Sequence, residues 1–204
     1  SRPAVREVLR ALELLGIIKT VPGGGNYIAD DLDSWLIGPL SILFKLNNGY
    51  IRQTQQLRAA LEREMAILAA RKCTPLDAAE LWRILSSIDK AEDEKTRGEL
   101  DKELHTQIAK IADNPMIYSV LAAADQLTEN IIAGTRDYIM KKNRPEFKVD
   151  EQHRLLVEAI INNDEKGAEQ YMSEHMEIIE KCMDEMQKNS NNKRPANGIV
   201  IGGE

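Results

Sequence analysis

The sequence has few cysteines, few aromatic residues and no long apolar run, and each shortage narrows the class of protein. Two cysteines among 204 residues, Cys73 and Cys182, cannot form a disulfide framework and fit a reducing compartment. Aromatic residues make up 4% of the chain while long helical patterns dominate, so we expect an all-α main body. The longest apolar stretch, 35–44, is interrupted by Gly38 and Pro39 and is too short to span a bilayer. We therefore expect a soluble, cytoplasmic protein with no membrane partner.

Positive charge is also in the minority, but it is unevenly placed. The formal net charge is −6, which argues against nucleic-acid binding over the whole surface. Residues 1–29 carry four basic and two acidic side chains, a local charge of +2, which leaves −8 for the remainder. This asymmetry predicts two parts with different functions.

Patterning divides the chain into four segments. In residues 1–29 an amphipathic helix ends at Gly16 and is followed by two short strands around a glycine-rich turn. Residues 30–49 are a linker element, 50–188 a helical domain, and 189–204 an aperiodic tail that we expect to be mobile. The helical domain is predicted to contain helices at about 50–72, 75–93, 96–113, 115–141, 147–162 and 165–187.

Histidine is scarce too, and all three histidines occupy positions where a metal site could use them. Asp101 and His105 are four residues apart, so they project from the same side of a helix. His153 and His175 each lie on the apolar stripe of a separate predicted helix. A buried polar group without a partner costs about 1–3 kcal/mol, so four inward groups need a common partner. A divalent metal ion would satisfy them together.

Blander explanations of the same residues stand beside this one. A single histidine on an apolar face is more often a core histidine bonded to a backbone carbonyl, and Asp101 alone would be an ordinary solvated carboxylate. If all were of this kind, the chain would be a helical interaction module without metal. If a metal is held, one aspartate with three imidazoles favours zinc, with nickel, cobalt or manganese as alternatives.

Two parts of the sequence resemble a known family of bacterial transcription regulators. The run 1–13, followed by Gly16-Ile17-Ile18 and 22–28, resembles the recognition helix and wing of the GntR family. The later segments 57–62, 101–105 and 153–160 resemble the FCD ligand-binding domain of its FadR subfamily. The resemblance implies an antiparallel helical bundle preceded by a partial winged helix-turn-helix.

The resemblance also implies a ligand-binding site. In FCD regulators an aspartate and three histidines hold a divalent metal, and Asp101, His105, His153 and His175 match that pattern. A small organic acid commonly completes the coordination of the metal. Arg58 matches a family arginine near the cavity, where it would pair with an effector carboxylate. The alternative is an exposed ion pair with Glu62, four residues later.

For DNA, Arg2 and Arg6 match recognition-helix arginines that enter the major groove, and Gly24 and Gly25 would bring the wing close to the DNA backbone. The alternative is a solvated helix face. The family has two helices before the recognition helix, and this sequence does not contain them. We therefore expect the polypeptide as given not to bind DNA properly.

The function implied is transcription regulation, with repression favoured over activation, in a homodimer that binds operator DNA. An acid bound at the metal would change the spacing of two DNA-reading helices. The rival is an all-helical metalloenzyme acting on a small carboxylate or ester. The sequence contains no His-Glu-x-x-His, no Glu-x-x-His and no evident general base, so it favours sensing over catalysis.

Overall fold

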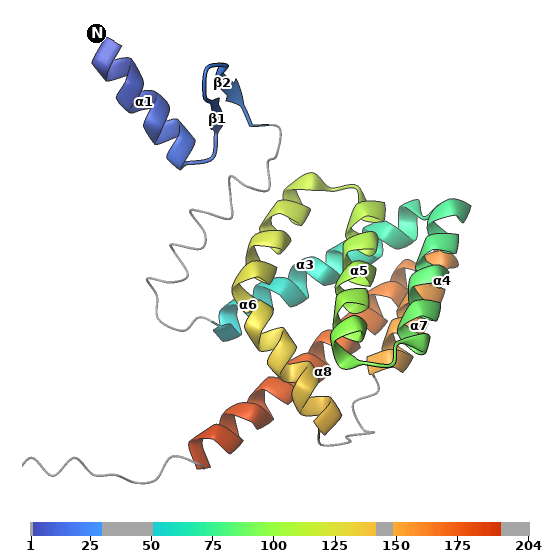
Figure 1. Cartoon of the computed structure of the whole chain (residues 1–204). Coiled ribbons are helices and arrows are strands. Elements are labelled where there is room, and N and C mark those ends of the chain that lie inside the picture. The colour runs from blue at the N-terminus through green and yellow to red at the C-terminus, as the bar shows by residue number, and fades with distance from the viewer. Residues whose placement is uncertain (1, 30–50, 142–148, 193–204) are drawn as a thin grey trace, which may run out of the picture.

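The computed structural model describes residues 2–29, 51–141 and 149–192, and within these ranges it contains seven helices and one two-stranded sheet (Figure 1). This mainly helical architecture with a small hairpin confirms the predicted fold class. The predicted linker element, residues 30–49, lies outside the described residues, as do residues 193–204. In chain order the elements are α1 (Arg2–Leu14), β1 (Ile18–Val21), β2 (Gly25–Ile28), α3 (Ile51–Lys72), α4 (Pro75–Lys90), α5 (Glu94–Ala112), α6 (Pro115–Lys141), α7 (Val149–Ile161) and α8 (Glu165–Asn192).

The N-terminal helix and hairpin form where the sequence predicts them. Strands β1 and β2 pair antiparallel, with Ile18 opposite Ile28. The amide of Gly24 donates to the carbonyl of Val21 at 2.9 Å, and Gly23 has a φ of 75°. Proline at the second position and a positive φ at the third are the features of a type II turn, which explains the Pro22-Gly23 pair.

Helix α3 lies at the centre of the helical part, where it contacts α5, α6, α7 and α8 (Figure 1). Its inner face carries Met65, Ala66, Ala69 and Ala70, all of them fully buried. Alanine adds little bulk, so neighbouring helices approach α3 closely and their larger side chains fill the core. Helix α4 covers this core from outside by packing against α5 and α7.

Capping residues set the helix boundaries between α3 and α5. Thr74 Oγ1 accepts from the amide of Asp77 at 3.3 Å, and the Asp77 carboxylate accepts from the amide of Thr74 at 3.0 Å, which confirms the predicted cap. The next boundary was predicted two to three residues too late. Asp93 caps α5 by accepting from the amide of Thr96 at 2.9 Å, so α4 ends at Lys90 and α5 begins at Glu94.

The last helix is longer than the sequence pattern predicts. Helix α8 continues to Asn192, beyond the predicted helix end at 187, so residues 189–192 are helical. Once a helix is established, each added residue gains a backbone hydrogen bond at little further cost, even without an apolar stripe. In residues 2–29, 51–141 and 149–192, no helix is both long and apolar enough to cross a membrane.

Candidate metal centre

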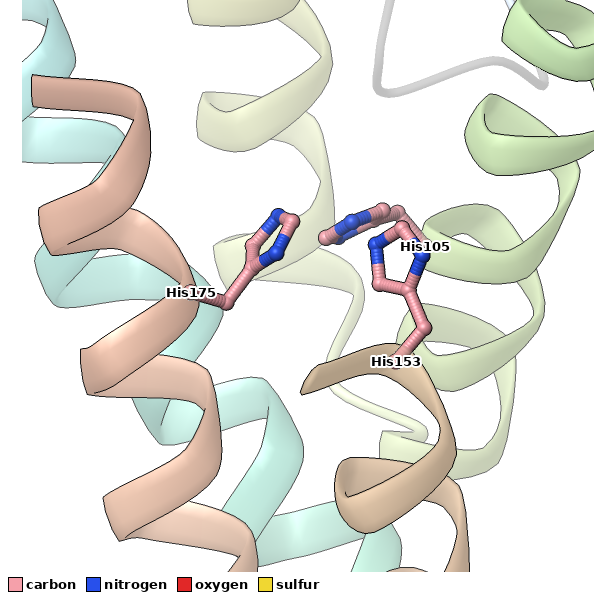
Figure 2. A group of neighbouring side chains, drawn as sticks. All are labelled: His105, His153 and His175. Carbon is pink, nitrogen blue, oxygen red and sulfur yellow. The ribbon is translucent and has the colours of Figure 1, made fainter. Parts of the chain in front are cut away.

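Three helices each contribute one histidine to a common cluster, His105 from α5, His153 from α7 and His175 from α8 (Figure 2). One candidate ligand atom from each ring lies within 4.8 Å of the other two. The ring centroids of His153 and His175 are 4.6 Å apart, and His105 lies 5.2 Å from His175 and 5.7 Å from His153. Figure 2 shows the three rings directed toward one another from separate helices. The structure thus brings together all three histidines of the chain.

Packing of apolar stripes carries these histidines inward. Each follows the helical spacing of buried aliphatic or thioether side chains on its own helix, so burying the stripe also buries the imidazole. The flanking buried residues are Leu104 and Ile108 on α5, Leu156 and Val157 on α7, and Met172 and Met176 on α8. The inward placement predicted from the sequence is confirmed for these positions.

The buried imidazoles of His153 and His175 lack ordinary partners. Their exposed fractions are 1% and 4%. Among the residues that the structure describes, three of their ring nitrogens make no hydrogen bond: Nδ1 and Nε2 of His153 and Nδ1 of His175. Leaving such an atom buried costs about 1–3 kcal/mol. Burial, together with the neighbouring His153 and His105, holds the pKa of His175 well below its ordinary value, so this ring is neutral, the form that binds metals. The donor set fits a divalent metal ion, and the triad could hold one.

Asp101 lies beside the triad and touches one of its members. Its Oδ1 is 3.0 Å from Nε2 of His153, which is ion-pair distance although the angles are not those of a hydrogen bond. The sequence pairs Asp101 with His105, one turn away on α5, whereas in the structure Asp101 contacts His153 across the helix interface. The side chain of Asp101 is 14% exposed, so it stands at the edge of the cluster. Its role as a fourth ligand stays a prediction.

A chain of charged side chains joins helix α3 to the cluster. Arg58 donates through Nη2 to Oε1 of Glu62 at 3.1 Å, and through Nε to Oδ1 of Asp125 on α6 at 2.5 Å. The second oxygen of Glu62, Oε2, lies 3.0 Å from Nδ1 of His105. Arg58 also donates to Gln55 at 3.3 Å. Glu62 therefore links the buried guanidinium of Arg58 to one candidate metal ligand, His105.

The electrostatics of this chain follow from burial and from ion pairing. Burial lowers the pKa of His105, but the charge and hydrogen bond of Glu62 outweigh it and raise the pKa to about 9. Burial raises the pKa of Glu62, but His105 and Arg58 outweigh it, and the net pKa is below its ordinary value. Burial raises the pKa of Asp125, and Arg58 only partly offsets this effect. Of the two carboxylates paired with Arg58, Asp125 therefore has a raised pKa and Glu62 a lowered one.

Sequence reasoning missed the place of Glu62 and Asp125. It considered Glu62 only as half of an exposed pair, and that alternative is wrong because Arg58 and Glu62 are 7% and 1% exposed. One signal was present in the sequence, since Glu62 lies three and four residues before Met65 and Ala66 and so continues the buried face of α3. No sequence spacing connects Asp125 to Arg58, because they are on different helices.

The predicted DNA-reading residues lie on the surface of the N-terminal unit. Arg2 and Arg6 are exposed on α1, which buries none of its own residues within the described part of the chain. Gly25 has a φ of 102°, and a Cβ on Gly24 would lie 3.0 Å from a methyl of Val21. Both glycines thus have a local reason in the turn, and contact with DNA stays a prediction for all four positions.

Comparison with known proteins shows the family to which this chain belongs. The FCD domain family model matches residues 53–178, which contain the three histidines, Asp101 and Arg58. This chain belongs to the FCD-domain regulators of the GntR family. It is 30% identical over 183 residues to the uncharacterized HTH-type transcriptional regulator YcbG of Bacillus subtilis, covering 88% of this chain and 72% of that protein. The HTH-type transcriptional regulator LutR of the same organism is 26% identical over 182 residues, with 88% and 83% covered.

Solved structures show the same fold. The Streptococcus agalactiae GntR structure has a TM-score of 0.64 at 23% identity, and the match covers 89% of this chain and 82% of that chain.

A third sequence relative, a putative L-lactate dehydrogenase operon regulatory protein of Escherichia coli, is 24% identical over 187 residues, covering 90% of this chain and 72% of that protein. Because these relatives are transcription regulators, this FCD-domain protein is a transcription regulator, and the metalloenzyme alternative is not favoured.

Proposed function

We propose that this FCD-domain regulator senses a small organic acid at a divalent metal ion held by Asp101, His105, His153 and His175. The observation that carries the proposal is the buried triad, in which His153 and His175 have ring nitrogens without hydrogen-bond partners among the described residues. A metal ion would bind one nitrogen of each ring, and an ion with five or six ligands would leave coordination positions for an effector. Zinc is the first candidate, and nickel, cobalt and manganese are the alternatives.

Arg58 is proposed to bind the carboxylate of the effector. It is 7% exposed and is joined to His105 through Glu62, so it belongs to the same buried network as the metal centre. Asp125 is the partner that an effector carboxylate would replace, since its raised pKa shows that pairing with Arg58 does not fully offset its burial. The metal ion would share the charge of a bound acid, so burying the carboxylate of that acid costs less than burying the carboxylate of Asp125. Exchange of Asp125 for the acid is therefore favourable.

The name of one relative suggests a ligand to test. The Escherichia coli protein is described as a putative L-lactate dehydrogenase operon regulatory protein. L-lactate carries a carboxylate and a neighbouring hydroxyl, which together can occupy two positions on a metal ion while the carboxylate also reaches a guanidinium. We therefore propose a 2-hydroxy acid as the effector class and L-lactate as its first member.

Regulation is proposed to pass from the helical domain to the DNA-reading unit. Arg2 and Arg6 on α1 would contact bases in the major groove, and Gly24 and Gly25 would let the wing approach the phosphates. In a homodimer, operator half-sites are related by the protein two-fold axis, so a shift of the helical domains changes how well the spacing of the two DNA-reading helices matches the half-sites. A coupling free energy of about 1–3 kcal/mol is sufficient for such control. The cytoplasm is the compartment where such a regulator meets its operator.

The test begins with the metal and continues with the acid. The protein purified without chelator should contain about one divalent ion per chain, and a fully folded protein that takes up no zinc, nickel, cobalt or manganese would contradict the proposal. With zinc saturating, Arg58→Lys should weaken L-lactate binding at least tenfold, or about 1.4 kcal/mol, because lysine cannot form the bidentate pair.

Arg71 provides the matched control for that substitution. It lies on the same helix and forms an ion pair with Glu165 of α8 at 2.6 Å, but both side chains are exposed, whereas His153 and His175 are buried. Arg71→Lys should leave acid binding unchanged. Equal losses in both variants would show a general effect on α3 rather than recognition of a carboxylate.

A further inference from the structure

Glu62 contacts both the candidate effector residue Arg58 and the candidate metal ligand His105. It is 1% exposed, and its two carboxylate oxygens have separate partners. Oε1 accepts from Nη2 of Arg58 at 3.1 Å, and Oε2 lies 3.0 Å from Nδ1 of His105. A buried carboxylate engaged at both oxygens has one orientation, so it can in turn fix the orientation of the imidazole.

The nitrogen that Glu62 contacts determines which nitrogen is left for a metal. An imidazole whose Nδ1–H donates to a carboxylate presents Nε2 as its lone-pair donor, and the carboxylate also makes that lone pair more basic. His105 comes from α5 while Glu62 comes from α3, so the contact also fixes the ring relative to the central helix. We infer that Glu62 is a positioning residue of the metal centre, which holds His105 with Nδ1 toward itself and Nε2 available to the ion. This inference rests on the proposed metal function.

Arg58 completes the arrangement from the other side. Without the guanidinium, the carboxylate of Glu62 would be buried with one oxygen unpaired, which is costly for a charged group. Arg58 is itself held by Gln55 at 3.3 Å and by Asp125 at 2.5 Å, so Glu62 is anchored by a side chain that has further anchors. The positioning of His105 is therefore built from α3 and α6 as well as from its own helix.

The alternative is that Glu62 forms an ion pair with a purely structural role. The two roles predict different effects of substituting Glu62 on protein stability and on zinc affinity. If Glu62 only ties α3 to α5, its removal lowers the free energy of unfolding and leaves the affinity of the folded protein for zinc unchanged. If Glu62 positions a ligand, zinc affinity falls in a protein that is still folded. Substitution of a partner behind a metal-bound histidine lowers metal affinity by about 10- to 100-fold.

The experiment measures zinc binding by competition with a chelator in the wild-type chain, in Glu62→Gln and in Glu165→Gln. Glutamine keeps the shape of Glu62 and removes its charge, and Arg58 keeps Asp125 as a partner. Glu165→Gln is the matched control because Glu165 also pairs with an arginine of α3, at 2.6 Å, on the exposed side. We expect Glu62→Gln to bind zinc about 10- to 100-fold more weakly and Glu165→Gln to bind as wild type.

A spectroscopic readout separates positioning from stability. In the zinc-loaded wild-type protein, nitrogen-15 NMR should show His105 protonated at Nδ1, with that proton protected from exchange. Glu62→Leu should lose the protection, and if this variant fails to fold, the zinc affinity of Glu62→Gln still decides. Zinc binding within threefold of wild type by Glu62→Gln would overturn the inference. Failure of the wild-type protein itself to bind zinc would instead overturn the proposed function.

Discussion

Replacement of His175 by leucine should change stability in opposite directions with and without metal. His175 is 4% exposed, and its Nδ1 makes no hydrogen bond within residues 2–29, 51–141 and 149–192. Without a metal ion, this imidazole therefore weakens the core, and a leucine of similar volume would restore apolar packing beside Met172 and Met176. With a metal ion, the same substitution removes one ligand.

The magnitudes follow from these two environments. An unpaired buried nitrogen costs about 1–3 kcal/mol, and repacking after an apolar replacement of similar size usually costs less than about 1.5 kcal/mol. In chelator, His175→Leu should therefore be more stable than wild type by about 1 kcal/mol, or roughly 3 °C in Tm for a domain of this size. Zinc at about 100 times its Kd should stabilise the wild-type protein by about 2.7 kcal/mol and the variant by much less.

The assay is urea or thermal unfolding of both proteins in chelator and in excess zinc. Met172→Leu, one turn earlier on α8 and fully buried, is the control for repacking and should keep the full zinc stabilisation. The order of stability of wild type and His175→Leu should reverse between the two conditions. A variant that is less stable than wild type by more than about 2 kcal/mol in chelator would refute the reasoning, because it would identify His175 as a satisfied core histidine.

Three further results are expected. Zinc affinity should rise about tenfold per pH unit from neutral pH toward 9 and then level off. The reason is that His105, whose pKa is raised to about 9, must lose its proton to bind the ion. A flat pH profile in chelator-competition titrations would contradict this expectation. In a chain that includes the complete winged domain, the double substitution Arg2→Ala and Arg6→Ala should weaken operator binding and reduce its dependence on salt concentration. Fluorescence anisotropy measures both quantities. An unchanged salt dependence would exclude contact of these arginines with phosphates or bases. Thr74→Ala should lower the free energy of unfolding by about 1 kcal/mol through loss of the α4 cap, and Ser86→Ala, at an exposed position of α4, should have little effect.

Helix positions were predictable because they depend on local periodicity and caps. The pair Thr74 and Pro75 marked the start of α4 within one residue, since a side-chain cap and a first-turn proline act within a single turn. The boundary near Asp93 was missed because Asp93 as a cap competes with a continuing helix, and the sequence pattern does not decide between them. The end of α8 was missed because helix extension needs no apolar pattern.

Helical spacing was enough to predict a mainly helical protein whose three histidines face inward, because spacing along a helix fixes which side chains share a face. Only the tertiary structure decided which faces meet. The spacing of Arg58 and Glu62 is the same for an exposed pair and a buried one, and the packing of α5 and α6 against α3 made it buried and joined it to His105 and Asp125. Likewise, the partner of Asp101 across the interface is His153, since contacts between helices depend on how they pack and not on their distance along the chain.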